Sequence, residues 1–315
     1  MQTSLARGFT LLEMVVSIIL LGIVATTIGA FILPAVTAQQ DVERRAALVD
    51  ATESALRRMS RDIRLALPNS VRISNSITGG VGFAIEMIPA LDGGKYCDSG
   101  VANCAGASQL LDITVSDTDF DVVGCFRNST FTGASFPSTA FRLVIGDSSG
   151  LVYSASGSPA VVTPSGTSIT LSTVNGGGAG SGTCGTSSGT NTSYRHHLAI
   201  SGGHRFSTAS SRQRVFVVQT SALPVTYICN ATTGTLTRYA GYSIQSSQPT
   251  DASAAPLSTA SSIGRVAGNI SSSGCGITSD TPSVQSRSVV TLSIGLTSSG
   301  ESVQLMSQVQ LDNSQ

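Results

Sequence analysis

"RGFTLLEMVVSIILLGIVATTIGAF", residues 7–31, contains one carboxylate, Glu13, in a run that carries no other charge after Arg7. From Phe9 to Ala38 this glutamate remains the only charged residue. The run exceeds the roughly 20 helical residues that cross a bilayer. An ordinary secretory signal has a shorter apolar core that ends in small residues. The segment therefore predicts a membrane-spanning helix with an acidic residue near its start.

The helical pattern continues beyond the apolar run. Apolar residues recur at spacings of three, four and seven, with one long gap at Glu53: Val42, Ala46, Val49, Leu56, Met59, Ile63 and Leu67. Pro68 and Asn69 then end the pattern. We predict one continuous helix over residues 9–67, about 90 Å long. Residues 9–38 would span the membrane or fill a filament core, and residues 39–67 would form an amphipathic half packed on a head of residues 68–315.

Three features of this helix predict how it bends, where it contacts other helices and what surrounds its carboxylate. Pro34 should bend it, because proline removes a backbone hydrogen bond. Gly22, Thr26 and Ala30 form a small-residue row at fourfold spacing, which suits close helix–helix contact. A carboxylate in the apolar span costs up to about 3 kcal/mol. Glu13 is therefore expected either to pair with a cation at the same depth or to lie at the headgroup boundary.

The stretch "GFTLLEMVVSIILLGIVA" resembles the N-terminal signature of type IV prepilins and type II secretion pseudopilins. The resemblance implies that prepilin peptidase removes residues 1–8 by cutting between Gly8 and Phe9, and that the new amino group of Phe9 is methylated. It also implies that Glu13 neutralises an N-terminal amine, its own or a neighbour's, during assembly. Many major pilins have a proline at the position of Ala30, whereas this chain has Pro34, so the place of the bend stays open.

The chain after the helix is expected to form an antiparallel β-rich head, and the fold class is α+β. Strands are predicted at residues 71–73, 81–89, 111–115, 120–123, 141–145, 151–154, 168–171, 214–219, 225–229, 235–242, 288–296 and 302–311. Two hairpins are predicted, one turning at Gly234 and one at residues 298–300. The Gly- and Ser-rich stretches 175–193 and 246–262 are predicted to be flexible or loosely packed loops on the outer face.

The order of these elements is similar to that of the large minor pilins of mannose-sensitive haemagglutinin pilus systems, and to PilW-type minor pilins and J-type pseudopilins. This resemblance implies a protein that assembles through its helix and helps to initiate or cap a filament at the tip. Its partners would be other major and minor pilins, prepilin peptidase and the inner-membrane assembly platform. The chain would cross the inner membrane once with a periplasmic head, and would later become part of the extracellular pilus.

Composition agrees with an exported β-rich protein. Only 11% of residues are charged, and the 18 basic residues balance the 18 acidic ones, so no net field favours nucleic acid as a partner. Six cysteines without a CxxC pair argue against a zinc ribbon. In an exported segment they are expected to form three disulfides.

Fifteen pairings are possible for six cysteines. The resemblance to J-type heads implies that Cys229 and Cys275 lie close together and form a bridge. Cys97 and Cys104 are expected to pair locally, because they are close in sequence within a Gly-rich loop. A bridge between Cys125 and Cys184 then follows by elimination.

Catalytic signals are weak. Two pentapeptides match G-x-S-x-G, at residues 146–150 and 185–189. The first has the pattern of a hairpin turn and the second lies in low-complexity sequence, whereas a nucleophile elbow needs a strand and a following helix. His196, His197 and His204 fit no ligand spacing and are expected in surface loops. We expect no enzymatic activity, cofactor or metal. The alternative is a bitopic envelope protein with an extracytoplasmic ligand-binding or hydrolase domain.

Overall fold

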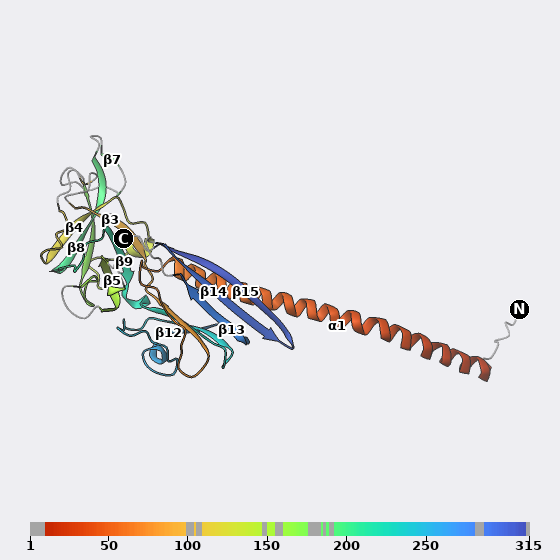
Figure 1. The fold of residues 1–315 in the computed structure, drawn as a ribbon. Coiled ribbons are helices and arrows are strands. Elements are labelled where there is room, and N and C mark those ends of the chain that lie inside the picture. Colours follow the sequence, from red (N-terminus) through yellow and green to blue (C-terminus); the bar gives the residue numbers. More distant parts are fainter. Residues whose placement is uncertain are drawn as a thin grey trace, which may run out of the picture.

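The structure is a computed structural model, and it describes residues 10–98, 104, 109–146, 150–154, 160–175, 184, 187–188, 192–280 and 287–312. One long helix projects from a head of antiparallel β-sheets, and the described N-terminal end lies far from the head (Figure 1). The predicted α+β class, with a long apolar helix and a large β-rich head, is confirmed.

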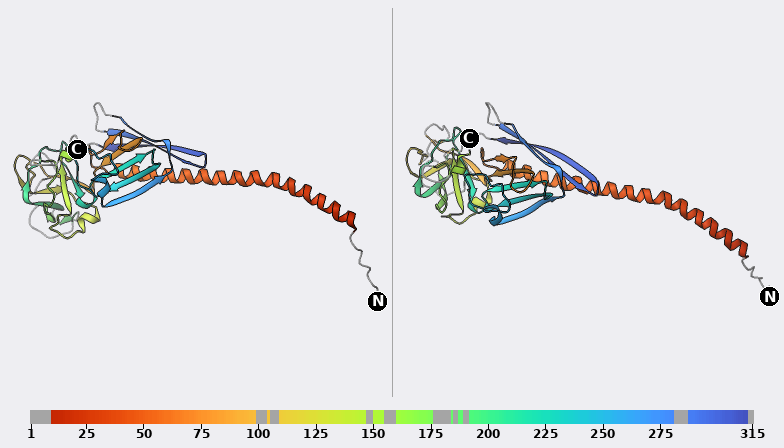
Figure 2. Two further views of the ribbon diagram at one scale, coloured as in Figure 1. Left: turned by 90° about the horizontal axis from the view of Figure 1, so that it is seen from below. Right: turned by 60° about the horizontal axis from the view of Figure 1, so that its bottom comes forward.

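The helix α1 runs without interruption over Leu11–Arg64. Its second half lies along the strands β14 (Arg287–Ser298) and β15 (Glu301–Asp312), whereas its first half extends freely and curves gently (Figure 2). Buried side chains begin at Leu48 and continue through Met59 to Ile63.

The predicted apolar face is wrong in its first turns. Val42 is 68% exposed and Val49 is 37% exposed, because the face that meets the sheet passes through Leu48 and Thr52 instead. Thr52 is fully buried, and its hydroxyl donates to the carbonyl oxygen of Leu48 at 2.6 Å. The apolar pattern has a gap between Val49 and Leu56. Thr52, a polar residue whose hydroxyl bonds its own helix, packs against the sheet within that gap.

Two sheets pack on the second half of α1. The first has the order β13-β14-β15, with β13 at Ile270–Ser279. The second has the order β1-β2-β10-β11-β12. Its strands are Arg72–Ser74, Gly82–Met87, Val225–Asn230, Thr235–Ala240 and Ser262–Gly268. Both predicted hairpins are confirmed: Gly234 turns β10 into β11, and Ser299 and Gly300 join β14 to β15 with positive φ angles.

A third sheet forms the far end of the head. Its order is β5-β9-β3-β4-β8-β6, and β7 pairs with β8. In chain order these strands are Asp92–Tyr96, Asp117–Val123, Phe141–Ile145, Ile169–Asn175, Ser187–Ser188, Thr192–His204 and Arg214–Gln219. The short helix α2 covers Ser129–Thr132, and the 3-10 helices η2, η3 and η4 cover Leu151–Ser154, Thr220–Ala222 and Leu257–Thr259.

The strand alternation of β2 divides the core between two faces of one sheet. Phe83 and Ile85 pack with α1 and the β13–β15 sheet. Ala84, between them, packs on the opposite face with Tyr242 and Leu257. The far sheet has its own aromatic core, in which Phe131 contacts neighbouring phenylalanine rings edge to face. A smaller apolar cluster joins the far sheet to the rest.

Two predicted strands are wrong. Residues 111–115 form a turn, because the Asp112 carboxylate accepts bonds from the Thr114 amide at 2.8 Å and hydroxyl at 2.6 Å. Residues 151–154 form η2, which buries Val152 and Tyr153 at the junction of the sheets.

The stretch 246–262 is mostly a loop, as predicted, but it contains η4 and it is not loosely packed. Leu257 is fully buried against the β1–β2–β10–β11–β12 sheet. Most of the other predicted loop, 175–193, lies outside the described residues, and its described part includes β7.

Candidate assembly segment

The start of α1 is organised by a local cap. Thr10 has extended backbone angles, and its hydroxyl oxygen accepts a bond from the amide of Glu13 at 3.3 Å. Glu13 therefore lies in the first turn, where a carboxylate interacts favourably with the positive end of the helix dipole. Thr10 and Glu13 have the spacing of a capping box, a signal that sequence reasoning missed. Gly8 and Phe9 lie outside the described residues.

The first half of α1 has no partner within the described chain. Leu11–Ala30 has a mean hydropathy of 2.4 and is long and apolar enough to cross a membrane, and none of this window is buried. Leu11, Ile18 and Leu21 are each at least 65% exposed. An apolar surface of this size is unfavourable in water, so a membrane or other helices must cover it.

Hydroxyl groups on this half are satisfied within the helix. Ser17 donates to the carbonyl oxygen of Glu13 at 2.7 Å, and Thr26 donates to that of Ile23 at 2.9 Å. A helix that satisfies its own polar groups can be buried in hydrocarbon or among other helices at low cost.

The small-residue row lies on the bare part of the helix. Gly22, Thr26 and Ala30 are all exposed, and a Cβ added at Gly22 would meet nothing within 4 Å. Pro34 lies inside α1 without ending it, and the Thr37 hydroxyl donates to the Pro34 carbonyl oxygen at 3.0 Å. The row is therefore available to a partner helix from outside the chain.

The second half of α1 is held by both packing and charge. Met59 and Ile63 are fully buried in the main core. Asp62 accepts bonds from the Tyr227 hydroxyl at 2.7 Å and from Arg238 Nε at 2.8 Å. Burial and the neighbouring Asp62 charge raise the pKa of Tyr227, so this phenol stays protonated and remains a donor. These contacts fix the second half of the helix to β10 and β11, whereas the apolar window of the first half is exposed.

The match to a known family covers the N-terminal region of the chain, including most of the exposed first half of α1. The prokaryotic N-terminal methylation motif matches residues 4–29. The chain carries a type IV prepilin-like motif. Together with the apolar helix, this motif supports a type IV pilin-like protein, a family that is typically structural rather than enzymatic. No curated protein and no solved structure matches the chain significantly.

The six cysteines form three disulfides. Cys229 on β10 is bonded to Cys275 on β13, so this bridge joins the two sheets that pack on α1. The other bridges, Cys97–Cys104 and Cys125–Cys184, lie in the far part of the head.

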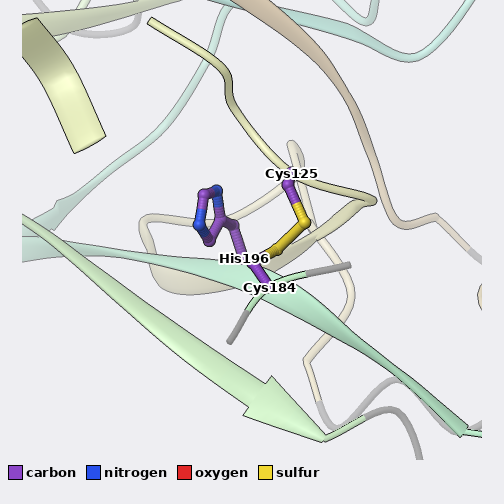
Figure 3. A group of neighbouring side chains, drawn as sticks. All are labelled: Cys125, Cys184 and His196. Atoms are coloured by element: carbon purple, nitrogen blue, oxygen red, sulfur yellow. A yellow bond between two sulfur atoms is a disulfide. The ribbon is translucent and has the colours of Figure 1, made fainter. Parts of the chain in front are cut away.

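His196 lies beside the Cys125–Cys184 bridge (Figure 3). Its Nδ1 accepts the amide of Phe126 at 2.9 Å, and burial lowers the pKa of its imidazole. Metal binding requires thiolates, and both sulfurs are bonded to each other. This group is therefore a packed structural unit in the disulfide form.

The prediction of surface-loop histidines is wrong. His196, His197 and His204 all lie on β8, and His196 and His204 are buried. The stretch "SYRHHLAI" carries only a weak strand signal, because three polar residues precede three apolar ones and strict alternation is absent. His197 Nδ1 lies 2.8 Å from the buried Asp121 carboxylate, and this hydrogen bond raises the pKa of His197.

The G-x-S-x-G matches gain no catalytic context. Gly146 and Gly150 are described, but residues 147–149 between them are not, and most of 185–189 also lies outside the described residues. The hairpin-turn interpretation of the first match is wrong, because the chain passes from β5 to η2 rather than to a second strand, and β5 pairs with β9.

Proposed function

We propose that this protein is a minor pilin of a type IV pilus of the mannose-sensitive haemagglutinin type, resembling the large minor pilin MshO. The observation that supports this most is the division of α1 into a bare apolar half that carries the methylation motif and a half fixed to a bulky head. Such a chain can insert its free helix among the helices of other pilins while its head stays outside the bundle.

In this proposal, prepilin peptidase cuts between Gly8 and Phe9, and the amine of Phe9 is methylated. Glu13 pairs with the N-terminal amine of its own or a neighbouring subunit, and the row of Gly22, Thr26 and Ala30 contacts a partner helix. The protein begins as a single-pass inner-membrane protein with a periplasmic head and enters the pilus through the assembly platform.

A tip position follows from the size of the head. About 250 residues form a body of ~18 Å radius of gyration, which is bulky for a repeated subunit of a thin shaft. A terminal subunit has no neighbour above it. We therefore expect a few copies per filament, detected by immunogold labelling at the tip, and uniform labelling along the shaft would contradict the proposal.

Intact mass spectrometry of the membrane-extracted protein tests the assignment. We expect the loss of residues 1–8 and the gain of one methyl group. Gly8→Glu should keep the leader, whereas Ser4→Glu, which adds the same charge away from the junction, should be processed normally. A mature wild-type protein that retains its leader would instead favour the bitopic envelope protein with an extracytoplasmic ligand-binding or hydrolase domain.

A further inference from the structure

A groove of about 500 Å³ lies where the far sheet meets the β1–β2–β10–β11–β12 sheet. One wall carries Arg142 of β5 and Tyr153 of η2, and the other is formed by residues 242–246, which follow β11. Its volume is within the range of small-ligand sites.

Arg142 is only 9% exposed and lines this groove. Its Nε donates to the carbonyl oxygen of Thr163 at 2.6 Å, which fixes the plane of the guanidinium. Among the described residues, its two Nη groups have no hydrogen-bond partner and no carboxylate lies within 4.0 Å of them. Burial lowers the pKa of Arg142, but a guanidinium starts so high that it stays charged.

Two partly buried arginines elsewhere in the head show the usual partner of a guanidinium that is shielded from water. Arg72 pairs with the buried carboxylate of Glu86, and Arg238 pairs with Asp62 at 2.8 Å. A buried charge without a counter-charge is unfavourable, so a free pair of Nη donors facing a hollow suits an anion from outside.

The other groove residues indicate what kind of anion fits. Arg142 is the only charged residue among the described lining residues, so the site matches one negative charge rather than a phosphate dianion. Hydroxyl side chains of Ser165, Thr220 and Ser243 line the same space, together with Tyr153 and Tyr242. Hydroxyl groups bind sugar hydroxyls. Tyr153 and Tyr242 are more than 90% buried, and the Arg72 guanidinium lies 3.7 Å from the centroid of the Tyr153 ring, so the two tyrosines add apolar wall to the groove rather than free stacking faces.

We propose that this groove binds an acidic saccharide, with the carboxylate of a uronate residue held by the two Nη groups of Arg142. The binding is non-covalent and requires no metal. It goes beyond a role in assembly, since the groove lies in the head and uses no residue of α1.

Calorimetric titration of the full chain in detergent tests this, with trigalacturonate as the probe and its fully methyl-esterified form as the neutral control. We expect saturable binding of the acid and at least tenfold weaker binding of the ester. Arg142→Met should weaken binding of the acid at least tenfold, whereas Arg265→Met, an exposed arginine on β12, should leave it unchanged. Arg142→Lys keeps the charge and should give an intermediate affinity because it cannot bind a carboxylate in a bidentate way.

The two ligands also test the proposal on the wild type alone, should a substitution at Arg142 prevent folding. Equal binding of acid and ester, or no binding of either, would overturn it. Binding of a tripeptide through its C-terminal carboxylate without binding of trigalacturonate would overturn the saccharide assignment. These results are independent of leader processing, so a failure here leaves the proposed pilin role standing.

Discussion

The two halves of α1 belong to one unbroken helix but meet opposite surroundings. The window Leu11–Ala30 has none of its surface buried, whereas Met59 and Ile63 are fully buried under β14 and β15. The first half is apolar on all sides, and the second half has one apolar face and one face rich in arginine. A helix that is apolar all round is suited to a membrane or a bundle, and one with a single apolar face is suited to a sheet.

The difference teaches where the stability of each half comes from. The second half is stabilised by the folded head, through the core and through Asp62 with Tyr227 and Arg238. The apolar window of the first half makes no packing contact with the described part of the head. A membrane or the helices of other subunits must therefore bury it. Changes in the two halves should therefore alter different measurements.

The largest effect is expected from removing the bridge between the two sheets that hold the second half. Replacing both Cys229 and Cys275 by serine releases a loop with a sequence separation of 46 residues. In the chain-entropy model this costs ~4 kcal/mol in the free energy of unfolding. Urea unfolding of the full chain in mild detergent, followed by circular dichroism, measures it. The double Cys97→Ser, Cys104→Ser variant is the control, because its far shorter loop should cost less. An equal loss in both would show that the sheet-to-sheet bridge has no special role.

The second prediction contrasts one buried and one exposed position of the same helix. Met59→Ala should lower the free energy of unfolding by about 3 kcal/mol, because it leaves a cavity in the main core. Val42→Ala, at a position that is 68% exposed, should change it by less than about 0.5 kcal/mol. The same unfolding assay compares them. If Val42→Ala lowered the free energy of unfolding as much as Met59→Ala, the head would have to pack against α1 further toward its N-terminus than the structure indicates.

The third prediction concerns assembly rather than stability. Glu13→Val removes the desolvation cost of a carboxylate, so membrane insertion should be unimpaired. Loss of the pairing with an N-terminal amine should reduce co-purification with partner pilins by about tenfold, a coupling of about 1.4 kcal/mol. Thr10→Val is the control, since it removes the cap but keeps the carboxylate. Undiminished co-purification of Glu13→Val would show that Glu13 has no pairing role in assembly.

The smallest effect is expected from pH, and it should be confined to the far sheet. All three histidines lie on β8, so neither α1 nor the sheets packed on it titrate near neutrality through histidine. The hydrogen bond to Asp121 raises the pKa of His197 above its ordinary value of 6.5. Its stabilisation is thus complete below pH 6.5 and is lost as the pH rises through the folded-state pKa.

His197→Gln isolates this contribution, because burial lowers the pKa values of His196 and His204 and gives them the opposite pH dependence. The difference in unfolding free energy between wild type and His197→Gln should be larger at pH 5.5 than at pH 8.5. A difference that grows with pH would contradict the role given to Asp121.

Much of this division is predictable from sequence, because hydrophobic periodicity and turn residues are local signals. The long helix with one acidic residue in its apolar half, the hairpin at Gly234 and the hairpin at Ser299 and Gly300 all follow from such patterns. It is harder to predict from sequence which residues of α1 face the core. Thr52 lies in the core and Val49 is partly exposed, since a threonine that bonds its own helix can replace an apolar residue where the helix meets the sheet.

The missed strands share another cause. β12 and β13 are rich in glycine and serine, and their order comes from pairing with β11 and β14 rather than from their own propensity. The groove at Arg142 could not be predicted either, because β5, η2 and the segment after β11 meet only in the folded chain. Phe9 lies outside the described residues, so the processing site still rests on sequence.

The stretch of α1 between its apolar window and Leu48 has a mechanical consequence. With Leu11–Ala30 across a bilayer, residues 31–47 extend the helix by roughly 25 Å before the head begins. The head would therefore stand clear of the membrane on a stalk. Pro34 lies near the base of this stalk, where the loss of one backbone hydrogen bond makes bending easiest. In that arrangement a small change of angle at Pro34 would become a larger displacement of the far sheet, and the head would reach a wider range of positions while the membrane segment stayed in place.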